Sequence, residues 1–117
     1  MARRVDVVLE EILETISGIE NAVGIRSFEA FRQDWLLQRG IERALEIVSE
    51  TVRHVPDDML GTRPEIPWSE IKAIGNVIRH EYHRVEPAII WSVAADDFPS
   101  LKAAILAIVS NQESKNN

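Results

Sequence analysis

The sequence predicts an all-α protein, an antiparallel bundle of two long and about three shorter helices. Apolar residues recur every three or four positions along three segments, which is the spacing of one face of an α-helix. Prolines stand where helices should begin or end, at positions 56, 67, 87 and 99. No alternating run of β-branched residues between turn residues indicates a strand.

The two long predicted helices lie in the N-terminal half. The first runs from Arg4 to about Val23, and its apolar stripe consists of Val5, Val8, Ile12, Ile16, Ile19 and Val23. Residues 27–32 form a short link or a single turn. Asp34 is a suitable N-cap for the second helix, which extends to about His54 and ends before Pro56.

The C-terminal half predicts three shorter helices after a polar connection over residues 57–65. The third helix runs from about Trp68 to His83, Pro87 opens a short fourth helix, and Pro99 starts the last one. Asp96 and Asp97 end the fourth helix or cap the fifth. Residues 1–110 are expected to form one domain and 111–117 a disordered polar tail. The predicted core includes Ile12, Ile16, Leu45, Val48, Ile74 and Ile78.

The composition of the chain excludes several classes of site and of function. The 117 residues include no cysteine, which excludes disulfides and thiolate metal sites. No signal peptide or membrane-spanning run is recognisable, so we expect a cytoplasmic protein that does not enter membranes. The net charge of −6 argues against unspecific binding to duplex nucleic acid. Residues 72–84, however, hold three basic residues and one acidic residue, a net charge of +2.

That basic stretch is one face of the third helix. At about 100° per residue, the expected core face holds Ile71, Ile74, Val77, Ile78 and Val85. The opposite face holds Lys72, Asn76, Arg79, His80 and His83, with Gly75 and Tyr82 at one boundary. Such a face is often merely solvated. His80 and His83 could ligate a metal, but no third ligand is evident, so we predict neither a metal nor a cofactor.

The third predicted helix and several segments outside it carry a family resemblance. The segment from Ile66-Pro67-Trp68 to Gly75-Asn76-Val77-Ile78-Arg79-His80-Glu81-Tyr82 resembles the HepT-like toxins of the HEPN superfamily. The similarity continues through Leu45-Glu46-Ile47-Val48-Ser49-Glu50, Ile90-Trp91 and Asp97-Phe98-Pro99-Ser100-Leu101, and therefore spans nearly the whole chain.

The resemblance implies a HEPN-like helical bundle that forms a homodimer, with two copies of the motif helix at a shared cleft. Many such proteins are metal-independent ribonucleases in toxin–antitoxin modules. Their partner is a minimal nucleotidyltransferase that acts as antitoxin, and in some modules it adenylylates the motif tyrosine. Here Asn76, His80 and Tyr82 match the family motif, and Tyr82 is the candidate modification site.

Gly75 stands where the family motif has an arginine. One interpretation is that glycine leaves a notch and that Arg79, one turn later, reaches back into it, because helical side chains lean toward the N-terminus. Gly75→Arg would then be expected to raise activity. The other interpretation is that Gly75 lets another helix pack closely and that Arg79 is an ordinary surface residue.

Metal-independent RNA cleavage needs a base, an acid and a positive charge near the phosphate. His80 suits the proton transfers and Arg79 suits the phosphate, so these two are the predicted catalytic residues. Asn76, Tyr82, His83 and Lys72 are the predicted binding residues for single-stranded RNA. The alternative function is a non-enzymatic HEPN protein that binds a nucleotidyltransferase or a nucleotide with the same face.

Overall fold

The computed structural model describes residues 4–81 and 85–115. Within these residues the chain is helical and contains no strand, which confirms the predicted fold class. The helices in chain order are α1 (Val5–Val23), α2 (Phe28–Arg32), α3 (Trp35–Val52), α4 (Asp57–Leu60), α5 (Trp68–Glu81), α6 (Pro87–Ser92), the π-helical turn η2 (Val93–Asp97) and α7 (Phe98–Lys115).

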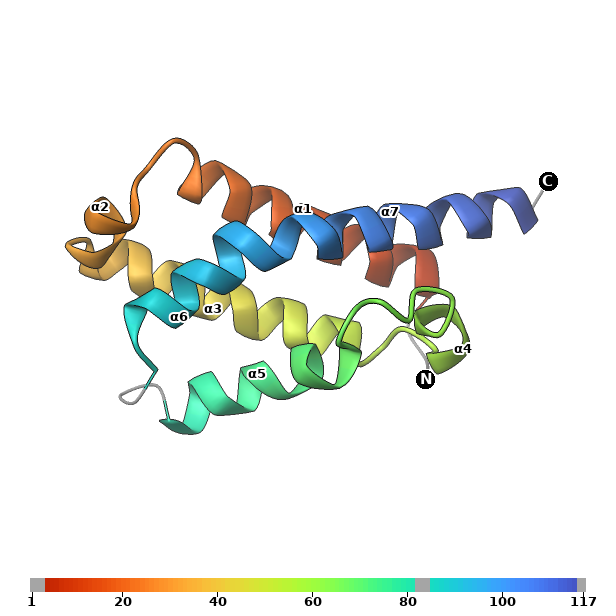
Figure 1. The fold of residues 1–117 in the computed structure, drawn as a ribbon. Helices are drawn as coiled ribbons and strands as arrows, with labels where there is room; N and C mark the ends of the chain where they lie inside the picture. Colours follow the sequence, from red (N-terminus) through yellow and green to blue (C-terminus); the bar gives the residue numbers. More distant parts are fainter. Residues whose placement is uncertain (1–3, 82–84, 116–117) are drawn as a thin grey trace.

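The four longest helices run antiparallel to their chain neighbours (Figure 1). α3 lies in the middle of the bundle, with α1 and α7 on one side and α5 on the other. Within the described residues, no helix is long and apolar enough to cross a membrane.

The core lies where α1, α3 and α7 meet. The predicted residues Ile12, Ile16, Leu45, Val48 and Ile78 are all buried. Ile74 is only half-buried, because it lines an open cleft beside α5. Complete burial of an aliphatic side chain contributes about 1.5–3 kcal/mol relative to its exposure, so this apolar cluster stabilises the bundle. Its members are Val8, Leu9, Ile12, Ile16, Ile19, Phe31, Ile41, Leu45, Val48, Val52, Val55, Leu60, Ile66, Ile78, Ile90, Ala94, Phe98, Leu101, Ala104, Ile105 and Ile108.

Local capping fixes the start of α3 as predicted. The Asp34 side chain accepts a hydrogen bond from the Leu37 backbone N–H at 3.0 Å. The link before it is the short helix α2, whose N-cap Ser27 accepts from the Ala30 N–H at 3.1 Å. The connection between α3 and α5 is not wholly irregular, since residues 57–60 form α4 directly after Pro56.

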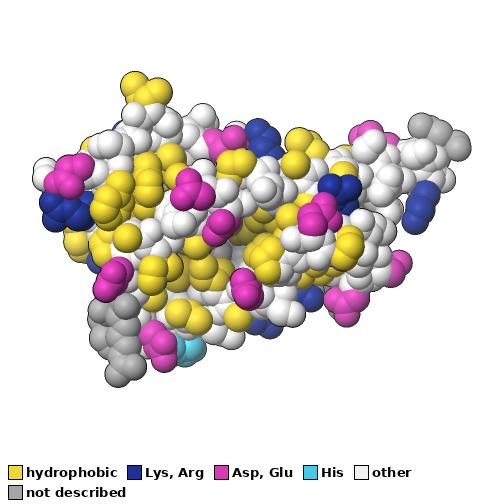
Figure 2. Space-filling model, viewed as in Figure 1, with side chains coloured by type: hydrophobic (Ala, Val, Ile, Leu, Met, Phe, Trp, Pro, Cys, Tyr) yellow, Lys and Arg dark blue, Asp and Glu magenta, His cyan; other side chains and the backbone are white. Residues whose placement is uncertain are grey.

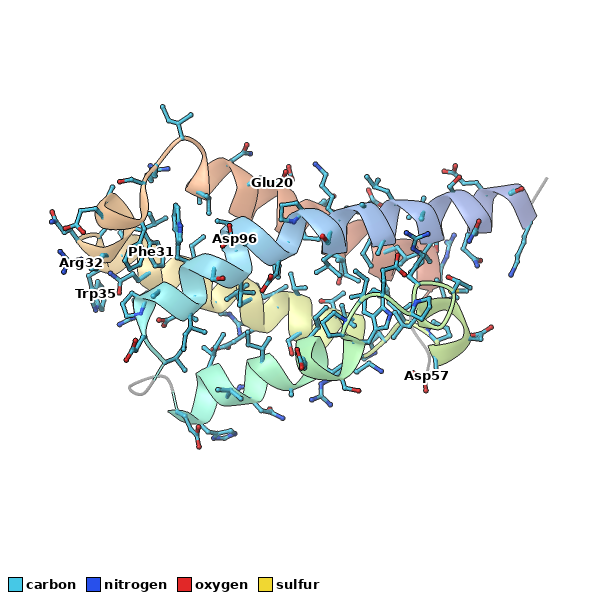
Figure 3. The ribbon with its side chains drawn as sticks, in the orientation of Figure 1. Glu20, Phe31, Arg32, Trp35, Asp57 and Asp96 are labelled. Carbon is cyan, nitrogen blue, oxygen red and sulfur yellow. The ribbon has the colours of Figure 1, made fainter. Side chains whose placement is uncertain are left out.

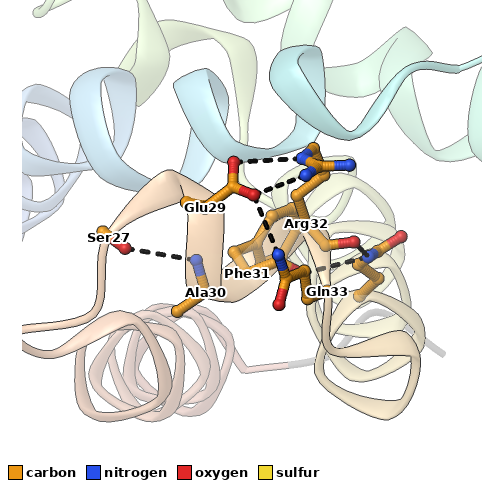
Figure 4. A network of polar contacts seen from close by, with 7 residues as sticks. Ser27, Glu29, Ala30, Phe31, Arg32 and Gln33 are labelled. Carbon is orange, nitrogen blue, oxygen red and sulfur yellow. Dashed lines mark hydrogen bonds and ion pairs between the residues drawn. The ribbon is translucent and has the colours of Figure 1, made fainter.

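A polar network spans α2 and its C-terminal cap (Figure 4). Glu29 accepts hydrogen bonds from Arg32 and from Gln33, the latter at 2.9 Å. The hydrogen bond from Arg32, followed by that from Gln33, lowers the pKa of the Glu29 carboxyl below its ordinary value. Beneath the network, buried Phe31 stacks at a tilt on Trp91 of α6 with ring centroids 5.2 Å apart.

The C-terminal helices correct the sequence prediction. Asp96 and Asp97 do not end a helix, because they belong to η2, and α6, η2 and α7 follow one another without a break. Pro99 lies in the first turn of α7, where the sequence predicts this helix to start. α7 continues to Lys115, so residues 111–115 are helical where composition predicts a polar tail. The bundle thus has a third long helix.

Candidate functional site

The start of α5 is anchored through its first residue. The Trp68 indole Nε1–H donates a hydrogen bond to the Arg63 carbonyl at 3.0 Å, and the ring packs half-buried against the core. Ile66, just before Pro67, is buried. These contacts hold the end of the polar connection against the start of α5.

Ser49 of α3 fixes the middle of α5. Its hydroxyl Oγ donates to the Lys72 carbonyl at 2.9 Å and accepts from the Gly75 backbone N–H at 3.1 Å. Arg53, at the end of α3, donates through Nη2 to the same Lys72 carbonyl at 2.7 Å. Three hydrogen bonds therefore join α3 to one turn of α5.

Gly75 has no open space beside it. A Cβ atom at this position would lie 2.8 Å from Ser49 Oγ, 3.0 Å from Ser49 Cβ and 3.7 Å from Glu46 Cα. The expectation of a notch that Arg79 could fill is therefore wrong, because Ser49 occupies the space. Gly75 allows α3 and α5 to approach closely, as the second interpretation proposed.

Asn76, Arg79 and His80 lie together on the exposed side of α5. Arg79 and His80 follow Asn76 by three and four residues, so the three side chains are neighbours on one helix face. All three are exposed, and none forms a hydrogen bond or ion pair with another described residue. Val77 also departs from its expected place on the core face, since its side chain is 43% exposed.

Lys72 is not a free cation. Its ammonium Nζ lies 3.2 Å from Asp57 Oδ1, which comes from the N-terminus of α4 (Figure 3). Asp57 is almost fully exposed, so this pair contributes little to stability, but it offsets part of the charge predicted to attract RNA. Tyr82 and His83, the remaining predicted site residues, lie outside the described residues.

Ser49 and Arg53 are structural parts of the site that the sequence analysis missed. The sequence held a signal for Ser49, because it stands four residues after Leu45 and three before Val52, on the apolar face of α3, where the structure shows it buried. In the described part of the chain, no group of three or more His, Asp or Glu residues could hold a metal ion.

The exposed face combines an imidazole, a guanidinium and an amide. The guanidinium can bind a phosphate through two parallel hydrogen bonds, and an imidazole can accept or donate a proton near neutral pH. Between Trp68 and Glu81, however, α5 holds one histidine. One copy of this described face therefore provides a single imidazole. Two groups of this kind would be needed where one must act as a base and the other as an acid.

Comparison of the sequence with known proteins identifies the family of the chain. A family model described as "Ribonuclease HepT-like" matches residues 12–108, which include α3, α5 and the Asn76–His80 face. The chain belongs to the HepT-like ribonuclease family. No solved structure gives a significant match.

Several HepT-like relatives align over most of their own length. A protein of Thermococcus cleftensis named probable ribonuclease HepT is 37% identical over 80% of this chain and 86% of its own. A candidate RNase of Caldanaerobacter subterraneus is 34% identical over 90% of this chain and 94% of its own. A candidate RNase of Methanocaldococcus jannaschii is 26% identical over 92% and 89%.

Proposed function

We propose that this protein is a metal-independent endoribonuclease that cleaves single-stranded RNA. The observation that carries the proposal is the exposed group of Asn76, Arg79 and His80 on one face of α5, in a chain of the HepT-like ribonuclease family. A flexible single strand can place its 2′-oxygen in line with the scissile phosphate. Ribonuclease names among the relatives support the same substrate class.

In the proposed cleavage, His80, Arg79 and Asn76 each have a different role. An imidazole removes the proton from the 2′-hydroxyl, whose oxygen attacks the phosphorus. The bond to the 5′-oxygen breaks, that oxygen receives a proton from an acid, and a 2′,3′-cyclic phosphate remains. His80 supplies the proton transfers, Arg79 binds the negative phosphate oxygens, and Asn76 orients phosphate or ribose. Arg79 acts from the exposed face, not from the position of Gly75.

A homodimer would complete this site. A two-fold axis beside α5 would bring the two His80 imidazoles to one shared site at the dimer interface, so that one acts as base and the other as acid. It would also double the positive charge next to the RNA. Light scattering at tens of micromolar should show a dimer, and a monomer at that concentration would contradict this part of the proposal.

We further propose that the protein is the toxin of a toxin–antitoxin module whose antitoxin is a minimal nucleotidyltransferase. Transfer of AMP from ATP to the Tyr82 hydroxyl, with release of pyrophosphate and of the phenolic proton, would place a negative phosphate two residues from His80 and block RNA binding. Co-expression with such an enzyme, followed by intact-mass measurement, tests this step. An adduct that persists in Tyr82→Phe would place the modification elsewhere.

The decisive experiment is cleavage of a labelled single-stranded RNA in the presence of EDTA. His80→Ala should lower the rate by about 10²–10⁴, the usual contribution of a general acid–base group. Arg79→Ala should lower it by about 10²–10³, as expected for the loss of a group that stabilises charge in the transition state. Arg26→Ala, an exposed arginine in the link between α1 and α2, is the control and should cleave like the parent. An Arg79→Ala protein as active as the parent would remove Arg79 from the mechanism.

Gly75, at the motif arginine position, favours a second candidate function. A non-enzymatic HEPN protein would bind a nucleotidyltransferase or a nucleotide through the same face. It would form the complex without cleaving RNA, and His80→Ala would alter binding only. Absence of any cleavage by the purified parent, together with binding of the nucleotidyltransferase, would decide for this alternative.

A further inference from the structure

An apolar cleft of about 380 Å³ opens on the side of α5 away from Asn76 and Arg79. α3 forms its floor, while the start of α5 and the junction of η2 with α7 form its two walls. The interior is lined by buried or half-buried apolar side chains, chiefly Leu45, Val48, Ile71, Ile74, Phe98 and Leu101. Its volume lies within the range of small-ligand pockets, at about 300–1,000 Å³.

The rim of this cleft is acidic. Glu65 and Glu70 border it from the α5 side, and Asp96 and Asp97 border it from the α7 side. Glu65 pairs with Arg63, but Glu70, Asp96 and Asp97 form no ion pair with any described residue. Figure 2 shows this face, with carboxylates around the hydrophobic side chains between α5 and α7. Figure 3 shows Asp96 on the α7 side.

The apolar surface continues beyond the cleft. Val77 lies one helical turn after Ile74 on α5 and is 43% exposed, and Ile89 of α6 is half exposed. Most contacts of α5 with the bundle are made with α3, so this edge of α5 has no helix over it among the described residues. The carboxylates of Asp96 and Asp97 at the cleft come from η2, and π-helical turns occur frequently at functional sites.

We infer that the cleft between α5 and the η2–α7 junction binds a basic segment of a protein partner. That segment presents an aliphatic or aromatic side chain to the apolar interior and lysine or arginine side chains to Glu70, Asp96 and Asp97. The acidic rim repels RNA, so this surface is separate from the cationic face of α5. The inference does not depend on RNA cleavage and holds for either candidate function.

The charges around the cleft favour a basic segment over other occupants. Three carboxylates without ion-pair partners, spaced around an apolar floor, would be neutralised by cations that flank an apolar anchor. A second copy of the acidic cleft itself would add like charges. A purely polar polycation would leave the floor covered only by water.

Three labelled synthetic peptides test the inference by fluorescence anisotropy. The first combines leucine and tryptophan on one helix face with lysines beside them. The second replaces each lysine by glutamate, and the third keeps the lysines but replaces the apolar residues by serine. Only the first should bind. In amide NMR spectra it should shift the resonances of Ile71, Ile74, Val93 and Leu101, which line the cleft.

Two variants and a matched control locate the binding. Glu70→Lys/Asp97→Lys should weaken binding of the first peptide about tenfold, because two attractions become repulsions. Ser100→Trp, at the exposed mouth, should block the cleft without touching the core. Glu10→Lys/Glu14→Lys on α1 makes the same change in net charge and should leave the affinity unchanged. Circular dichroism verifies that each variant folds.

Equal affinity for the parent and for Glu70→Lys/Asp97→Lys would overturn the inference. So would equal binding of the serine-containing peptide, which would show recognition of charge alone. Shifts confined to Asn76, Arg79 and His80 on addition of RNA agree with the inference, whereas RNA-induced shifts of the cleft residues would overturn it.

Discussion

The backbone N–H of Gly75 lies 3.1 Å from Ser49 Oγ, and a Cβ on Gly75 would lie 2.8 Å from the same oxygen. Ser49 therefore fits only because Gly75 has no side chain, and the Gly75 N–H finds its partner in the Ser49 hydroxyl. Gly75, where the family resemblance leads us to expect an arginine, is here a point of direct contact between α5 and α3. This contact determines how the face with Asn76, Arg79 and His80 is held.

Gly75→Ala should destabilise the fold by about 1–3 kcal/mol, because the added methyl group overpacks the contact with Ser49. In a Ser49→Gly background the same change should be neutral or stabilising, since alanine is the better helix former. A double-mutant cycle by urea unfolding measures the difference. Gly18→Ala and Gly40→Ala are matched controls with nothing near the new methyl group, and should stabilise by about 0.5–1 kcal/mol. Equal costs in both backgrounds would contradict the contact.

Gly75→Arg should lower RNA cleavage rather than raise it. The arginine stem would have to displace Ser49, which would shift α5 and break the hydrogen bonds to Lys72 and Gly75. Ser49→Gly in the same protein makes room and should recover part of the activity and stability. Cleavage rates and unfolding midpoints of the single and double variants provide the test. A Gly75→Arg variant that is more active at unchanged stability would restore the notch interpretation.

Periodicity predicted the helices well because the apolar stripes of α1 and α3 each bury one face. It failed where the deciding contact is between helices. Gly75 and Ser49 are 26 residues apart, and no local pattern shows that they meet. Nor does spacing reveal a π-helical turn, which is why the sequence predicts that Asp96 and Asp97 end the fourth helix or cap the fifth, whereas they lie inside η2. The grouping of Asn76, Arg79 and His80 could be predicted, since three- and four-residue spacing alone places them on one face.

Asp57→Asn should strengthen RNA binding a few-fold by freeing Lys72. The Lys72 ammonium is now paired with Asp57 at 3.2 Å, and a released cation can contact a phosphate. Each added phosphate contact steepens the dependence of affinity on salt by about 0.7 in a log–log plot for a single strand. Asp58→Asn is the control, because this neighbouring exposed carboxylate has no ion pair with a described residue. Identical salt slopes for the two variants would refute the role of Lys72.

Stability should fall on acidification partly through Glu29. Its pKa is lowered in the folded state by hydrogen bonds from Arg32 and Gln33, so its contribution is present above the unfolded-state pKa. That contribution is lost as the pH falls through the lowered folded-state value. Glu29→Gln should therefore lower the unfolding midpoint at pH 7, and the difference from the parent should shrink as the pH is lowered. Glu14→Gln, an exposed carboxylate on α1, should change neither. A pH-independent effect of Glu29→Gln would contradict this assignment.

Subunit mixing tests whether the site takes one His80 from each copy. If base and acid are the two imidazoles of a symmetric dimer, a mixed dimer of parent and His80→Ala lacks one of them. Activity should then fall as the square of the parent fraction, to about a quarter in an equal mixture. Independent sites would give a linear fall, to about half. The mixture must be unfolded and refolded together so that subunits exchange, and an equal mixture with Arg26→Ala controls for refolding losses. A linear dependence with dimers present would show that each copy carries a complete site, and that the second proton-transfer group must be sought within one chain.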